Sequence, residues 1–181
     1  INKSLRDFPG SFTLETWSAS DTLQFLNQTK DISPTINIQI GARTGPGNLI
    51  QEIGKVVADT NSESKLVVKN SLVPGAKNFV ARVEWALSVL PTNRVIAVAR
   101  GVEPANDLHR FTPNLIDLLV LREKFPELTL LVDISHMAGI SAENVLTLGG
   151  LTISWHNRLF DKNGIRPIDG FMLETDPDIA A

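Results

Sequence analysis

The stretch LLVDISHMAG, residues 130–139, decides how the rest of this chain is interpreted. A short apolar run ends in Asp133, and Ser135, His136 and Gly139 follow it. Short apolar runs that close on polar residues and glycine are typical of buried strands. If other strands of the chain end in the same way, their polar ends can gather at one edge of a sheet.

Six runs share this pattern, and helical patterns separate them. Their β-branched content and their Gly, Asn or Pro exits predict strands at 11–17, 36–42, 65–70, 94–101, 128–136 and 169–175. Apolar residues recurring at helical spacing predict helices at 18–29, 48–60, 76–90, 113–126 and 141–150. Ser18 or Ser20 is the expected cap of the first helix, and the last is expected to end at Gly149–Gly150. The stretch 149–170 is expected to be an insertion or a mixture of loop and helix.

Strand–helix alternation predicts an α/β fold with a parallel sheet, either open and doubly wound or closed as a barrel. The 181 residues suit a single domain, 1–181. A net charge of -3 argues against a nucleic-acid partner, and no apolar run is long enough to suggest a membrane span. The chain has no cysteine, which excludes thiolate metal sites and is compatible with a cytoplasmic protein.

Five predicted strands lead into a residue that can bind an anion or a metal: Arg43, Lys69, Arg100, His136 and Glu174. In a β/α barrel the carboxyl ends of the strands meet on one face, where such enzymes keep their active sites. Three cations suit a phosphate and a carboxylate, and the imidazole with the carboxylate makes half of a divalent-metal site. Taken singly, each residue could instead be a solvated or salt-bridged group.

Three other residues have side chains that could take part in a site. Glu15, at the end of the first predicted strand, is a weaker candidate for the site. His109 and His156 do not follow a strand, so a structural role is expected for both.

The segments IGART, LVVKN, ARG, DISHMAG and GFMLET, in this order, resemble type I 3-deoxy-7-phosphoheptulonate (DAHP) synthases over about residues 12–176. The likeness is closest to the form often fused to chorismate mutase. The resemblance implies a TIM-type (β/α)8 barrel that condenses phosphoenolpyruvate with erythrose 4-phosphate in the first step of the shikimate pathway. It implies a divalent metal (Mn, Fe, Co or Zn) and a homo-oligomer. In some members it also implies chorismate mutase, either as a fused domain or as a partner protein.

Carried over residue by residue, the resemblance assigns a role to each matching position. It makes Arg43, Thr44, Lys69 and Arg100 substrate-binding, Lys69 and His136 catalytic, and His136 and Glu174 metal ligands.

The chain also departs from the family's pattern. The family's metal-binding Cys and its Lys-Pro-Arg-Thr segment have no counterpart, Ile134 stands where a proline is usual, and Asp176 replaces a common histidine. We therefore expect about six of the eight strand–helix units, without the first two. Two alternatives stay open: a truncated, non-catalytic homologue that binds a phosphorylated anion, and a sister synthase for another phosphosugar, such as an octulosonate 8-phosphate synthase.

Overall fold

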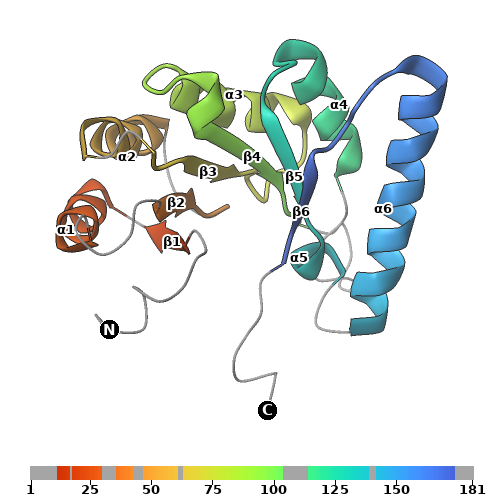
Figure 1. Cartoon of the computed structure of the whole chain (residues 1–181), viewed down its shortest axis with the longest axis horizontal. Helices are drawn as coiled ribbons and strands as arrows, with labels where there is room; N and C mark the ends of the chain where they lie inside the picture. Colours follow the sequence, from red (N-terminus) through yellow and green to blue (C-terminus); the bar gives the residue numbers. More distant parts are fainter. Residues whose placement is uncertain are drawn as a thin grey trace.

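The computed structural model describes residues 12–16, 18–29, 36–42, 47–60, 63–103, 114–138 and 142–173. Six strands alternate with helices along the chain (Figure 1). The strands are β1 (Phe12–Thr16), β2 (Ile36–Ile40), β3 (Leu66–Lys69), β4 (Val95–Ala99), β5 (Thr129–Asp133) and β6 (Gly170–Met172). The helices are α1 (Ala19–Thr29), α2 (Gly47–Thr60), α3 (Ala76–Leu87), α4 (Leu115–Lys124), α5 (Ile134–Ala138) and α6 (Ala142–Asn163), with a short 3-10 helix at Thr92–Arg94.

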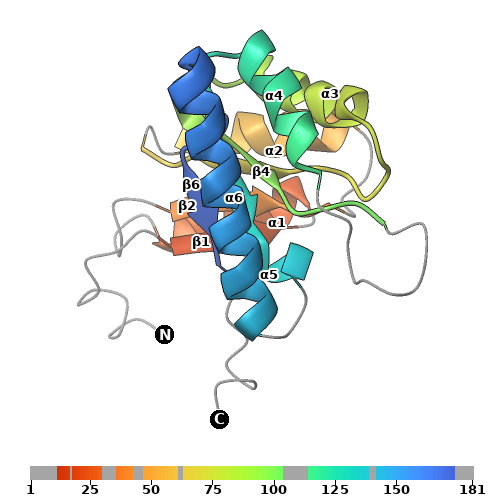
Figure 2. The same cartoon turned by 90° about the vertical axis from the view of Figure 1, so that its right-hand side faces the viewer.

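All six strands are parallel and lie side by side in the order in which they occur in the sequence. Helices α1, α2, α3, α4 and α6 follow one another around the outside of the sheet (Figure 1). Seen from the side of α6, that helix crosses in front of the sheet, and α4 and α3 continue the outer layer (Figure 2). The predicted α/β fold with six strand–helix units, matching part of a (β/α)8 barrel, is confirmed.

The core lies between the sheet and the outer helices because alternate strand residues face the helices. Ile38, Ile40, Val68, Ala97 and Val132 are buried there. They pack in the same cluster as the helical residues Ile50, Ile53, Phe79, Val83, Leu118 and Leu121. Burying each large aliphatic side chain stabilises the fold by about 1.5–3 kcal/mol. The intervening strand residues, Lys69 and Asp133 among them, face the other side of the sheet.

Helix α1 begins at the cap that its sequence predicts. The Ser18 hydroxyl accepts a hydrogen bond from the backbone N–H of Asp21, at 3.1 Å. This bond satisfies one of the N–H groups that have no partner inside the first turn of a helix. Asp21 lies in the same turn, where its negative charge is favourable.

The strand predicted at 128–136 is shorter than expected, because it ends at Asp133 and gives way to helix α5. The Asp133 side chain causes this change of direction. Its Oδ1 atom accepts hydrogen bonds from the Ser135 hydroxyl at 2.7 Å and from the His136 backbone N–H at 3.1 Å. An aspartate that binds the backbone two or three residues ahead favours a turn or a helix start over an extended strand.

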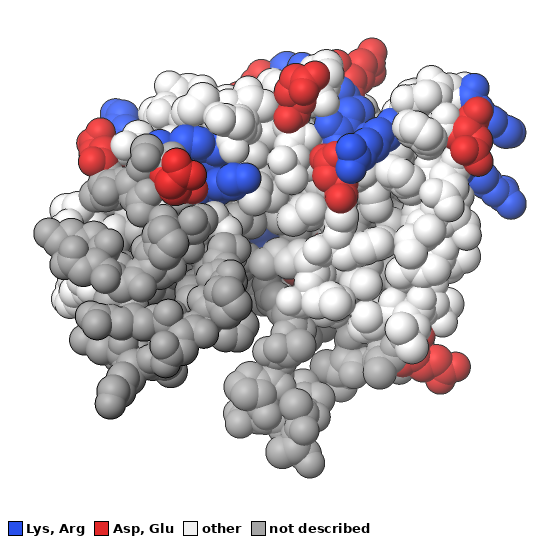
Figure 3. All heavy atoms as spheres, in the orientation of Figure 1, with Lys and Arg blue, Asp and Glu red and all other residues white. Residues whose placement is uncertain are grey.

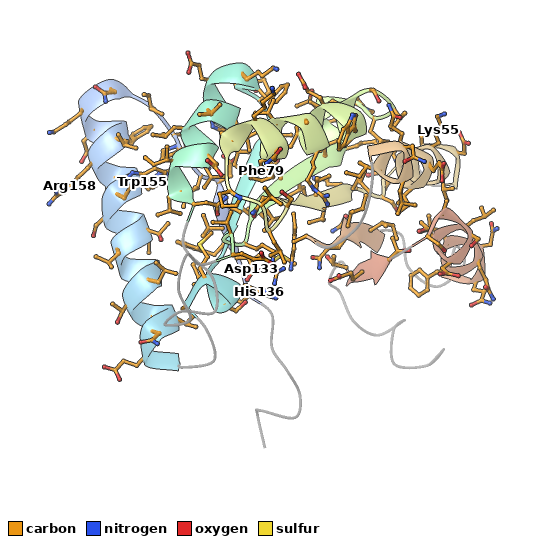
Figure 4. All side chains as sticks on the ribbon, turned by 180° about the vertical axis from the view of Figure 1, so that it is seen from behind. Lys55, Phe79, Asp133, His136, Trp155 and Arg158 are labelled. Carbon is orange, nitrogen blue, oxygen red and sulfur yellow. The ribbon has the colours of Figure 1, made fainter. Side chains whose placement is uncertain are left out.

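The predicted helix end at Gly149–Gly150 is wrong, because helix α6 continues through both glycines to Asn163. The expected mixture of loop and helix over 149–170 is confirmed, since residues 164–169 follow the helix as a loop that leads to β6. The inward face of α6 carries Val145, Leu148, Thr152 and Trp155, buried or half-buried, on both sides of the glycine pair. This packing outweighs the roughly 1 kcal/mol that each glycine costs in a helix interior. In Figure 4, Trp155 points toward the body of the protein and Arg158 points away from it.

Arg122 of α4 holds the segment between α6 and β6 against the sheet. Its guanidinium donates to the backbone oxygens of Arg166 at 2.7 Å and Leu128 at 2.9 Å, and to the Asp169 carboxylate at 2.7 Å. Asp169 in turn accepts the backbone N–H of Leu130 at 2.8 Å. These bonds lie at the start of β5 and β6, the opposite end of the sheet from Asp133.

None of the helices within the described ranges is long and apolar enough to span a membrane.

Candidate functional site

Asp133, the last residue of β5, is the centre of the candidate site. Its Oδ2 atom lies 3.0 Å from the Lys69 ammonium and 2.7 Å from the Nδ1 atom of His136. Figure 4 shows Asp133 and His136 next to each other. The carboxylate at the end of β5 therefore contacts both residues that were expected to be catalytic, Lys69 at the end of β3 and His136 in α5.

The Lys69–Asp133 pair is buried, with 3% of the Lys69 side chain and none of the Asp133 side chain exposed. Burial alone raises the pKa of Asp133, because it disfavours the charged form. The hydrogen bond from His136, the charge of Lys69 and the hydrogen bond from Ser135 act in the opposite direction and hold that pKa well below its usual range. Asp133 is therefore a carboxylate at neutral pH, and it balances a buried ammonium.

The partner of Nδ1 decides which tautomer His136 adopts. Asp133 is ionised and can only accept, so Nδ1 carries the proton and donates it to Oδ2. The lone pair of the neutral ring is then on Nε2. Histidines that ligate metals are commonly oriented by a carboxylate in this manner.

The backbone at the ends of β3 and β4 is fixed by side chains. Asn70 accepts the backbone N–H of Arg100 at 2.7 Å and donates to the Gly101 carbonyl at 2.9 Å. The Gly101 N–H in turn donates to the side chain of Asn114 at 3.1 Å. These bonds fix the backbone of Arg100 relative to Lys69, so two predicted anion-binding residues sit on a rigid frame.

Arg100 is the residue directly after β4, next to the end of β3. The register pairs Lys69 with Val98, two residues before Arg100 in the sequence. Arg100 is buried, as Lys69 is. That the two cations bind one anion stays a prediction.

Glu15 and Gln39 extend the polar face of the sheet toward β1 and β2. The Gln39 amide donates to Oε2 of Glu15 at 2.8 Å, and the two residues are register partners. The Glu15 carboxylate lies over Gly41, where a Cβ atom would collide with it. Glu15 was a weaker candidate in the sequence, and it stays one, because no contact joins it to Asp133.

The remaining predicted site residues, Arg43, Thr44 and Glu174, lie outside the described residues, as does His109. Their roles stay predictions. His156 lies on α6 and its ring stacks on Phe160, which fits the structural role expected for it. In Figure 3 the middle of the face is hollowed, and atoms of basic and acidic residues lie at the floor of the hollow.

A divalent metal was expected on His136 and Glu174. His136 suits this role, because the carboxylate on Nδ1 leaves Nε2 as the ligating atom. Within the described residues no group of three or more His, Cys, Asp or Glu is placed to hold a metal ion. The described part of the chain thus offers one oriented ligand and not a whole metal centre.

Two solved structures are similar to this chain in fold. A truncated form of 3-deoxy-D-arabino-heptulosonate 7-phosphate synthase from Thermotoga maritima matches 92% of this chain with a TM-score of 0.66 and 20% identity. A DAHP synthase structure from the same organism matches 91% of it, also with a TM-score of 0.66 and 20% identity. The chain spans 53% and 41% of their respective lengths. At this identity the likeness shows the fold.

Neither a protein-family model nor a curated protein sequence matches the chain.

Two contributors to the site were not among the predicted site residues. Asp133 opens the polar end of LLVDISHMAG, but its contact with Lys69 has no local sequence signal. Arg82 lies on α3 and donates to the backbone oxygens of Lys69 and Gly41. A single arginine within a helix gives no indication of which backbone carbonyls it will meet.

Proposed function

We propose that this chain carries part of the active site of an aldol-type synthase that joins phosphoenolpyruvate to erythrose 4-phosphate, giving 3-deoxy-7-phosphoheptulonate. The observation that carries the proposal is the Lys69–Asp133–His136 cluster at the carboxyl ends of β3 and β5. Active sites of β/α barrels form at this end of the strands. The ordered segments from IGART to GFMLET and the shared fold of the two DAHP synthase structures support the same assignment.

Lys69 and Arg100 are proposed to bind the phosphate and carboxylate of phosphoenolpyruvate, together with Arg43 and Thr44. Charge-assisted hydrogen bonds to these groups are among the strongest that side chains make. Asp133 keeps the Lys69 ammonium directed along the polar face of the sheet, and the buried surroundings limit screening of its charge. Lys69 is also proposed to stabilise negative charge that develops on the bound enol.

His136 and Glu174 are proposed as ligands of a divalent metal. When bound, such an ion would polarise the aldehyde of the sugar phosphate as a Lewis acid. Asp133 contributes by holding the His136 ring and its tautomer. The further ligands, the identity of the metal, the oligomeric state and any chorismate mutase partner are part of the expectation from the family.

The test measures loss of phosphoenolpyruvate ultraviolet absorbance by the full chain, with and without erythrose 4-phosphate, before and after chelation. Phosphoenolpyruvate binding is measured in parallel by titration calorimetry. The decisive variant is Lys69→Met, and Lys124→Met is its control, because Lys124 pairs with Glu84 on the exposed outer surface. We expect binding to weaken by about 10- to 100-fold in Lys69→Met, a few kcal/mol for a charge-assisted contact, and to be unchanged in Lys124→Met.

The outcomes separate the alternatives. Sugar-dependent loss of absorbance that chelation stops supports the synthase. Binding without turnover identifies a non-catalytic homologue that kept the anion site. Turnover with a five-carbon aldose phosphate in place of erythrose 4-phosphate identifies the octulosonate branch. If the chain binds no phosphoenolpyruvate, or binds it equally well without Lys69, the proposed anion site is wrong.

A further inference from the structure

Arg82 occupies an unusual place for an arginine. It lies on α3, and only 4% of the residue is exposed. Burial lowers its pKa to about 10, which still leaves the guanidinium charged at neutral pH. A buried charge is costly unless hydrogen bonds satisfy it. The groups that accept hydrogen bonds from the Arg82 guanidinium therefore indicate its role.

Among the described residues, these partners include two backbone carbonyls at the ends of the neighbouring strands β2 and β3. Nε donates to the oxygen of Lys69 and Nη2 donates to the oxygen of Gly41, both at 2.9 Å. The β2–β3 ladder ends one residue earlier, where Ile40 pairs with Val68. Arg82 therefore bridges the two strands at the point where their own pairing stops.

Both strand ends lead directly into the proposed anion site. Lys69 belongs to the buried pair with Asp133, and Gly41 precedes Arg43 by two residues in the sequence. The planar guanidinium is suited to this task, because its N–H groups have fixed directions and can hold two acceptors at a set separation.

We propose that Arg82 is a positioning residue for the anion site: by clamping the ends of β2 and β3 to each other it sets where the Lys69 side chain starts. This inference rests on the proposed function, because the ligand is the anion proposed there. Arg82 does not itself contact the ligand, since its guanidinium is buried against the backbone. Its effect on binding passes through Lys69 and the β2 end.

The chain offers a matched control in Arg94. Its Nε donates to the Ser64 carbonyl and its Nη2 to the Val57 carbonyl, both at 2.9 Å. Arg94 thus makes the same pair of bonds as Arg82, but next to the start of β3 and β4. Arg82→Met and Arg94→Met each remove two bonds to backbone oxygens, so both are expected to lower the melting temperature. Only Arg82→Met disturbs the carboxyl ends of the strands.

The test compares binding of phosphoenolpyruvate, and of inorganic phosphate as a simpler probe, in the full chain and its variants. We expect Arg82→Met to weaken binding by roughly 10- to 100-fold, the range seen when groups that orient metal ligands are removed, and Arg94→Met to change it less than about twofold. Arg82→Lys should recover part of the loss, because an ammonium can still donate to one or both carbonyls. The backbone N–H of Asn70 donates to the Val98 carbonyl at 3.0 Å, and its hydrogen exchange should accelerate in Arg82→Met and not in Arg94→Met.

Equal effects of the two methionine variants on binding would overturn the inference, since Arg82 would then act through general stability alone. If Arg82→Met does not fold, Arg82→Lys is compared with Arg94→Lys by the same criteria. If the wild type binds phosphate but not phosphoenolpyruvate, the proposed function fails and the phosphate affinities still decide the role of Arg82. If the wild type binds neither probe, both are wrong.

Discussion

Replacing Asp133 with Asn is the sharpest test of the buried cluster. The two side chains have nearly the same shape, so the change removes the charge and little else. Asn can still accept the Ser135 hydroxyl and the His136 N–H that now bond to Oδ1. Its amide nitrogen cannot accept from Lys69, which leaves a buried ammonium without its carboxylate partner.

The expected cost follows from this burial. Breaking a buried ion pair by removing one partner typically costs about 3–5 kcal/mol, because an uncompensated charge is left behind. For a chain of this size that corresponds to a fall in melting temperature of roughly 6–20 °C. Asn in place of Asp should also move the imidazole proton of His136 from Nδ1 to Nε2, since an amide N–H2 group can donate to Nδ1.

Equilibrium denaturation between pH 3 and 8 measures the stability term. The folded pKa of Asp133 lies below its unfolded value of about 3.9, so the carboxylate stabilises the fold above that value and the contribution is lost as pH falls toward the folded pKa. The difference between wild type and Asp133→Asn should therefore be present above the unfolded pKa and shrink as the pH falls below about 4. Nitrogen NMR of the imidazole reports the tautomer.

The control is Glu84→Gln in the exposed pair with Lys124, where both side chains are 48% exposed; its cost should not exceed about 1 kcal/mol. Adding Lys69→Met to Asp133→Asn should restore part of the loss, with a coupling energy of about 1–3 kcal/mol. If Asp133→Asn costs no more than Glu84→Gln, or if its cost does not depend on Lys69, the buried ion pair is not what holds the two strand ends together.

Three further predictions concern helices and loops. In urea unfolding, Gly54→Ala on α2 should lower the free energy of unfolding by about 1–3 kcal/mol, because the new Cβ would overlap Val89. Gly150→Ala on α6 should raise it by roughly 0.5–1 kcal/mol, because its Cβ would meet nothing. If both substitutions change the free energy of unfolding in the same direction, the packing described for these helices is wrong. Ser18→Ala should cost about 0.5–2 kcal/mol through loss of the cap on α1, measured by thermal unfolding, and Ser18→Asp should not. Arg122→Met should destabilise by about 1–3 kcal/mol, since it removes the partly buried bonds to the Leu128 carbonyl and to the Asp169 carboxylate. It should leave phosphoenolpyruvate affinity unchanged; a change in affinity would show that the two ends of the sheet are coupled.

Local signals were enough to predict most of the fold. A run such as that at 65–70, bounded by polar residues, has the length and composition of a buried strand before any tertiary contact is known. The order strand–helix–strand then restricts the sheet to a parallel arrangement, which brings the carboxyl ends of the strands to one edge. Lys69 and His136 could therefore be placed in one site from sequence position alone.

The local rules failed where tertiary packing outweighs them. The double glycine in α6 is a helix-ending signal, but apolar residues on both sides of it are partly buried against the core, and this packing outweighs the cost of the glycines. The strand through 128–136 ended early because the Asp133 carboxylate captured the backbone N–H of His136. Both effects depend on side chains whose partners could not be known in advance.

That charged and imidazole side chains follow the strands could be predicted from the order of residues along the chain. The contacts of Asp133 with Lys69 and His136, and the bonds by which Arg82 holds the β2 and β3 ends, could not be predicted, because they depend on the folded arrangement. Both arrangements bring together groups that are far apart in the chain and buried. Their stability comes from removing water around paired charges and backbone carbonyls, a property of the packed environment that no short stretch of sequence contains.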